Sequence, residues 1–136
     1  MKINHVLMLL PMIGVLGCEP SADEQAAPLL SRIDSLYRNG HYEQALDSIE
    51  TLRLRHPEAI ESRRKALKIW QDASLRLVQH DVGRTDSALQ ATLQEQQHAE
   101  SLYEKNRLRV KCDSLRTRWE TLCGVVRIIR EKQKED

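Results

Sequence analysis

Apolar residues recur at helical spacing over most of the chain, and turn residues divide this pattern into segments. Pro28 suits the first turn of a helix, and Gly40 suits the left-handed position that ends one. The spacing between them predicts a first helix over 28–38. A second helix is predicted over 42–55, because its apolar residues share one face and Pro57 then stops it.

A third helix is expected from Pro57 to about His80. Gly83 and two candidate N-cap residues follow, so we expect a break or bend within residues 81–86. A fourth helix then begins near Thr85. The apolar stripe of the third helix comprises Ile60, Leu67, Trp70, Leu77 and Val78.

The sharpest pattern lies near the C-terminus, where apolar residues alternate at spacings of four and three. Three heptads of this spacing indicate a coiled-coil seam, although Gly124 weakens the helix by about 1 kcal/mol relative to alanine. The pattern stops before Leu108, so residues 83–136 form either a hairpin that turns near Lys105 or one long helix with a phase shift. We expect the seam to be a surface for a partner. Its members are Leu108, Leu115, Trp119, Leu122, Val126 and Ile129, with Cys112 between them.

The composition agrees with an all-α fold. The chain has no Phe and only 4% aromatic residues, which leaves few large rings to fill a wide core. Leucine, alanine, glutamine, arginine and glutamate favour helices over strands. We therefore expect a helical hairpin capped by a third helix over 28–82, followed by a coiled-coil-like arm over 83–136.

The first two predicted helices resemble a tetratricopeptide repeat, and the match is position-specific in its second half. The matching residues are Gly40, Tyr42, Ala45, Ile49, Leu52 and Pro57. The first helix departs from the pattern, since Leu29 and Ile33 stand where the repeat has an aromatic and a small residue. A single repeat cannot bury its own faces, so the resemblance implies that the third helix caps it. A generic helical hairpin explains the same positions.

The first eighteen residues have the order of a signal peptide. Lys2 supplies a positive charge, and an apolar run from Val6 to Leu16 follows it. Eleven residues are too few to span a bilayer, which needs about twenty. The run ends directly before Gly17 and Cys18.

This ending resembles the lipobox of bacterial lipoproteins, which Val15, Leu16, Gly17 and Cys18 match position by position. The resemblance implies that residues 1–17 are removed and that Cys18 is acylated, which anchors the chain in a membrane. Residues 18–27 would then be a flexible tether. Glu19, rather than aspartate, after the cysteine favours the outer membrane. An ordinary signal peptide with an incidental cysteine is the alternative.

Charge gives no reason to expect nucleic-acid binding. Lys2 is the only charged residue before Cys18, so of the 21 basic and 20 acidic residues the chain beyond it keeps equal numbers. Two local basic clusters stand out, and anionic lipid, an acidic partner or a mixed solvated surface explains either. The first comprises Arg53, Arg55, Arg63, Arg64, Lys65 and Lys68. The second comprises Arg127, Arg130, Lys132 and Lys134.

No residue pattern points to catalysis, a cofactor or a metal. The histidines after the leader are isolated from other ligands at the spacing that zinc sites use. Cys112 and Cys123, eleven residues apart on one helix, are separated by about 16 Å of rise and cannot form a disulfide with each other. They are either apolar filler or partners in an intermolecular disulfide.

These observations predict a membrane-anchored lipoprotein that acts as a protein-binding or scaffold module in the cell envelope, not an enzyme. Its partners would be the membrane, through Cys18, and an envelope protein whose identity the sequence does not specify. A homo-oligomer formed through the seam is a related prediction. The alternative is a structural coiled-coil spacer that has no specific binding groove.

Overall fold

The computed structural model describes residues 19–135, which form four helices and no strand. The predicted all-α fold is therefore confirmed. The leader and Cys18 lie outside the described residues. The helices are α1 (Ala22–Arg38), α2 (Tyr42–Arg55), α3 (Ile60–His98) and α4 (Leu102–Glu135).

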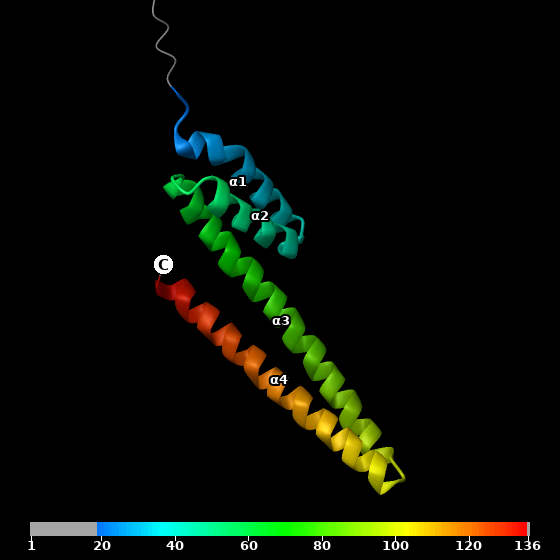
Figure 1. The fold of residues 1–136 in the computed structure, drawn as a ribbon. Helices are drawn as coiled ribbons and strands as arrows, with labels where there is room; N and C mark the ends of the chain where they lie inside the picture. The colour runs from blue at the N-terminus through cyan, green and yellow to red at the C-terminus, as the bar shows by residue number, and fades with distance from the viewer. Residues whose placement is uncertain (1–18, 136) are drawn as a thin grey trace, which may run out of the picture.

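The molecule is elongated, and α3 runs through almost its whole length (Figure 1). Helices α1 and α2 pack against the N-terminal part of α3, whereas α4 returns antiparallel along the rest of it. With 39 residues, α3 is about 58 Å long at 1.5 Å per residue. Within residues 19–135, α3 is the only helix that packs on α4.

A small apolar core joins the first three helices. Its largest members are Ile33 from α1 and Ile49 and Leu52 from α2, all fully buried. Alanines make up the rest of the buried cluster, because small side chains let helices approach closely. They are Ala26, Ala59 and Ala66.

The turn between α1 and α2 depends on Gly40, whose φ of 78° lies in the left-handed region. Tyr37 and Tyr42 flank the turn with their ring centroids 5.7 Å apart, and the Arg76 guanidinium from α3 lies 5.9 Å from the Tyr42 ring. A hydrogen bond with Tyr37 raises the pKa of Arg76, so this guanidinium stays charged. The cluster attaches the turn to α3. Burial of Ala45 suits a tetratricopeptide-like pair and a generic hairpin equally, so the resemblance stays a prediction.

Helix α1 begins six residues earlier than predicted, at Ala22 instead of Pro28. Ser21 and Glu24 form a capping box: the Ser21 hydroxyl accepts from the Glu24 amide at 3.2 Å, and the Glu24 carboxylate accepts from the Ser21 amide at 2.7 Å. Pro28 is tolerated inside the helix. The predicted tether over 18–27 was therefore wrong from residue 22 onward.

The predicted break near Gly83 was also wrong, because α3 continues through it without a turn. A glycine inside a helix costs only about 1 kcal/mol, and packing against α4 offsets that cost. The expected boundary between 28–82 and 83–136 thus falls inside one helix. Of the two alternatives for the C-terminal region, the structure shows the hairpin. It turns at residues 99–101, before the predicted position at Lys105, and the Ser101 hydroxyl caps α4 by accepting from the Glu104 amide at 3.1 Å.

The two unusual glycines lead to opposite predictions. A Cβ on Gly83 meets no atom within 4 Å, so Gly83→Ala should stabilise the protein by about 1 kcal/mol. Gly40→Ala should destabilise it by about 1–2 kcal/mol, because alanine disfavours a positive φ. Urea denaturation followed by circular dichroism measures both changes. A loss of stability in Gly83→Ala would contradict a helix that is continuous through this position.

Candidate interaction surfaces

The predicted seam lies on the side of α4 that faces α3. Leu108 and Cys112 are buried, and the five other seam residues are half-buried. Because α3 is the only described helix that packs on α4, it is α3 that covers them. The half-buried members are Leu115, Trp119, Leu122, Val126 and Ile129. The structure thus places the seam in an intramolecular interface, and its use by an external partner stays a prediction.

The opposite side of this interface contains several polar residues. Thr85 and Thr92 of α3 are buried beside Leu89, and the Thr92 hydroxyl donates to the Ala88 carbonyl at 2.8 Å. Gln71 is also buried. Polar side chains thus occupy several buried positions of α3 that face α4. This is why an apolar heptad spacing is visible in the sequence of α4 but not in that of α3.

The cysteines and histidines form no recognisable reactive site. Both Cys112 and Cys123 are free and lie on α4, and burial of Cys112 is consistent with its role as apolar filler. Within residues 19–135, no group of three His, Cys, Asp or Glu side chains is placed to hold a metal ion.

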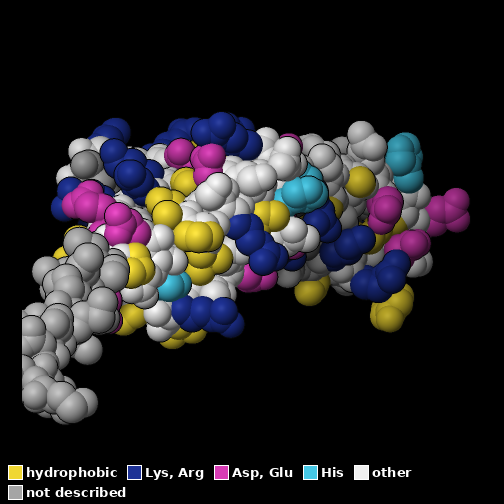
Figure 2. Space-filling model, turned by 90° about the horizontal axis from the view of Figure 1, so that it is seen from above, with side chains coloured by type: hydrophobic (Ala, Val, Ile, Leu, Met, Phe, Trp, Pro, Cys, Tyr) yellow, Lys and Arg dark blue, Asp and Glu magenta, His cyan; other side chains and the backbone are white. Residues whose placement is uncertain are grey.

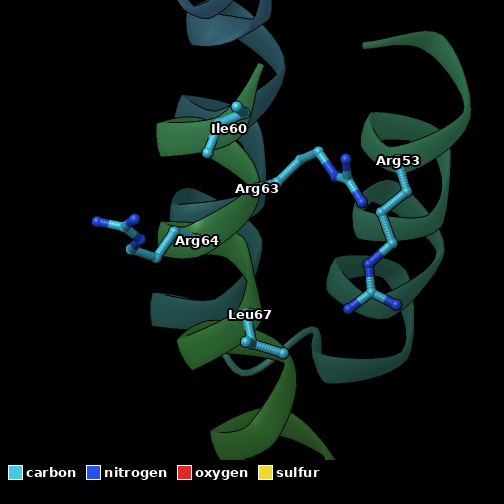
Figure 3. Close-up of a pocket in the computed structure, with 5 residues that line it drawn as sticks. All are labelled: Arg53, Ile60, Arg63, Arg64 and Leu67. Atoms are coloured by element: carbon cyan, nitrogen blue, oxygen red, sulfur yellow. The ribbon is translucent and has the colours of Figure 1, made fainter. Parts of the chain in front are cut away.

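A shallow hollow lies between the end of α2 and the first turns of α3, with a volume of about 470 Å³ (Figure 3). Arg63 reaches from α3 toward Arg53 on α2, while Arg64 points to the other side. Ile60 and Leu67 supply apolar surface, and Ile60 is 63% exposed. The hollow thus combines the guanidinium groups of Arg53 and Arg63 with exposed aliphatic surface.

The arginines of this hollow are held in different ways. The Arg53 guanidinium lies 5.8 Å from the centroid of the Trp70 ring, a cation–π contact. Arg63 donates to the Pro57 carbonyl at 2.7 Å. Arg64 is paired with Glu61 at 3.3 Å. Among the described residues, therefore, Arg53 and Arg63 have no carboxylate partner.

None of the residues that line the hollow belongs to α4. Gln133 of α4 donates to the Asp72 carboxylate at 2.7 Å, about three helical turns after the start of α3. Gln71 is buried, whereas Ile60, on the same face of α3, is 63% exposed. Sequence reasoning grouped Ile60, Leu67 and Trp70 as one core-facing stripe, because periodicity does not show which part of a helix a neighbouring helix covers.

The basic residues predicted as one cluster lie on different surfaces. Arg53, Arg63 and Arg64 line the hollow, but Arg55 lies by the groove between α1 and α2, and Lys65 lies by α1 near Ile69. In the second cluster Lys132 contacts Glu135 at 2.7 Å. Seen from above, basic side chains gather in several groups with acidic ones among them (Figure 2). In the hollow, two of the three lining arginines lack a carboxylate partner among the described residues.

A second exposed surface lies at the hairpin turn, at the other end of the molecule (Figure 1). Leu102 and Tyr103 open α4 and are 75% and 80% exposed, and Val110 two turns later is 66% exposed. From the sequence, Leu102 or Tyr103 was expected to face inward, which their exposure shows to be wrong, and Val110 was not singled out. The signal available was that they fall outside the heptad seam and follow the Ser101 cap.

The N-terminal segment is joined to the first turn of α3 by a hydrogen bond across 39 residues. The Asp23 carboxylate accepts from the Ser62 backbone amide at 2.7 Å. Ser62 is the third residue of α3. The N-cap residue of α3 is Ala59, whose methyl side chain cannot accept a hydrogen bond. This bond and the Ser62 hydroxyl lower the pKa of Asp23 below its ordinary value of 3.8. Asp23 therefore caps α3 and holds the start of α1 against it.

Asp23→Ala should lower the stability of the protein at neutral pH. Because the folded-state pKa of Asp23 is depressed, its contribution is present above pH 3.8 and is lost as the pH falls through the folded pKa. Urea midpoints of the variant and the parent protein should therefore differ at pH 7 and converge toward pH 2. Asp47→Ala, an exposed aspartate on α2, is the matched control and should show no such convergence.

Comparison with known proteins gives no assignment for these surfaces. No known protein family, curated protein or solved structure matches the chain. Among the described helices, none combines the length and the apolar character that crossing a bilayer requires. The hollow and the hairpin turn, at opposite ends of α3, are the two candidate interaction surfaces.

Proposed function

We propose that the protein is a membrane-anchored lipoprotein of the bacterial cell envelope that presents a helical hairpin to a protein partner. The observation that carries this proposal is the placement of the two ends of α3. The chain enters the folded body at Ser21, three residues after the predicted acylation site Cys18. The exposed turn of the hairpin lies at the other end.

The short connection supports a scaffold role. Three residues extend to at most about 11 Å, so an acylated Cys18 would keep the start of α1 near the membrane. The hairpin would then display its turn about 50 Å or more from the lipid surface, given 1.5 Å per residue over α3. Leu102, Tyr103 and Val110 are side chains of the types that contribute to protein–protein contacts when exposed together.

Self-association is a second candidate, and one observation favours it. Val125 and Ile128 are exposed on α4 outside the seam, with Ile128 58% exposed. These residues would form part of an interface between two copies of the hairpin. This alternative needs no other envelope protein.

The first experiment determines whether the anchor exists. The full chain is expressed in a bacterium and purified from its cell envelope. The purified protein should lack residues 1–17 and carry acyl mass on Cys18. Intact-protein mass spectrometry measures both. A protein that keeps its leader or carries an unmodified Cys18 would overturn the lipoprotein proposal.

The second experiment tests the hairpin turn as the contact surface. A photoreactive residue in place of Tyr103 should give a discrete adduct with another protein in intact cells, whereas one in place of Thr117, on the middle of α4, should not. Leu102→Ser combined with Val110→Ser should reduce the Tyr103 adduct roughly tenfold, because truncating central interface residues costs about 1–2 kcal/mol. Adducts only between copies of this chain would support self-association instead.

A further inference from the structure

We propose that the hollow formed by Arg53, Ile60, Arg63, Arg64 and Leu67 binds the phosphate of an anionic phospholipid, in the membrane that anchors the chain. The inference rests on the proposed acylation of Cys18 for the location of that membrane. It adds a second contact with the lipid surface. That contact orients the protein.

The charges of the hollow fit a phosphate group. Arg53 and Arg63 approach the same space from two helices, and neither has a carboxylate partner among the described residues. Guanidinium groups bind phosphate oxygens through paired, charge-assisted hydrogen bonds. Two such groups beside open solvent leave an excess of positive charge that a phosphate would neutralise.

Three carboxylates at this end of the molecule are already engaged. Asp23 accepts from the Ser62 amide at 2.7 Å, Glu24 accepts from the Ser21 amide at 2.7 Å, and Glu61 pairs with Arg64. The acidic first turn of α1 is thus used to cap helices and does not pair with Arg53 or Arg63. The hollow keeps its basic character although acidic residues lie close by.

The apolar part of the hollow fits a lipid surface better than an acidic protein in free solution. Ile60 is 63% exposed, and Leu54 in the last turn of α2 is 76% exposed. Exposed aliphatic side chains beside arginines are typical of helices that lie at the boundary between headgroups and acyl chains. Trp70, which carries Arg53 on its ring, adds an amphipathic side chain at the edge of the hollow.

The point where the chain enters the folded body, at Ser21, favours a membrane as the occupant of the hollow. The Asp23–Ser62 hydrogen bond places the first turn of α1 at the first turn of α3, which is the end of α3 that carries Ile60 and Arg63 on its other sides. From Cys18 to Ser21 the chain reaches at most about 11 Å. A tether through residue 27 would reach about three times as far and would leave the body free to turn. The capping box at Ser21 removes that freedom, so an acyl-anchored protein meets the bilayer with this end.

The test uses a tryptophan as a depth reporter. In the full chain with Trp70→Phe and Trp119→Phe, a new tryptophan is introduced by Ile60→Trp at the hollow or by Leu102→Trp at the hairpin turn. Both positions are exposed, so neither change should disturb the core. The purified protein is added to vesicles whose acyl chains are brominated, made either of phosphatidylcholine alone or with phosphatidylglycerol.

We expect brominated lipid to quench the reporter at position 60 on phosphatidylglycerol vesicles, more weakly on phosphatidylcholine, and to leave the reporter at position 102 unquenched. Arg53→Gln with Arg63→Gln should lower the docked-to-undocked ratio roughly thirtyfold, because each arginine near an anionic surface is worth about one kcal/mol. Arg107→Gln with Arg109→Gln, an exposed pair on α4, is the matched control and should change it little. Circular dichroism verifies that each variant remains helical.

Equal quenching on both lipids, no quenching at position 60, or no effect of the two hollow substitutions would overturn the assignment. A change in the fluorescence of the reporter at position 60 with soluble polyglutamate, but not with phosphatidylglycerol vesicles, would overturn the assignment in favour of an acidic protein partner. The mass of Cys18, measured on the same preparation, separates the two proposals. Unacylated protein that still docks would refute the proposed anchor but support the lipid site in the hollow. Acylated protein that does not dock would support the anchor but refute the lipid site.

Discussion

The rest of the structure depends on the continuity of α3, because both halves of the molecule pack on this one helix. Most helical stability in proteins comes from tertiary packing, so a helix of 39 residues depends on the neighbours that bury its apolar side chains. Its N-terminal part is covered by α1 and α2, and its remaining length by α4. Neither covering layer has a large core of its own. The helix is therefore the shared surface that lets two thin layers form one folded unit.

Local periodicity predicted the helices well where a single neighbouring face determined burial. The bounds of α2 and the burial of Ala45, Ile49 and Leu52 followed from apolar spacing and from the turn residues around them. The heptads of α4 also identified its buried face, but spacing alone does not say whether the covering helix belongs to the same chain. The sequence therefore predicted a surface for a partner, and α3 packs on the same residues.

The other departures arise from terms that spacing does not include. The capping box at Ser21 and Glu24 adds hydrogen bonds to α1, and it outweighs Pro28 as a sign of where the helix begins. Gly83 was interpreted as a stop, but tertiary packing exceeds its local cost. The hollow could not be predicted from the sequence, because no sequence pattern shows that Arg53 of α2 and Arg63 of α3 line the same space.

The capping of α3 by Asp23 links these features to the proposed function. A helix start without its own capping side chain must find another hydrogen-bond acceptor, and here the acceptor comes from the segment that follows the predicted lipid site. One hydrogen bond thus stabilises the first turn of α3 and fixes where the chain enters the body. Because α3 is continuous, a membrane that held its first turn, as proposed, would also set the direction of the whole hairpin. Orientation at the membrane and display of the distant turn would then be two consequences of the same helix.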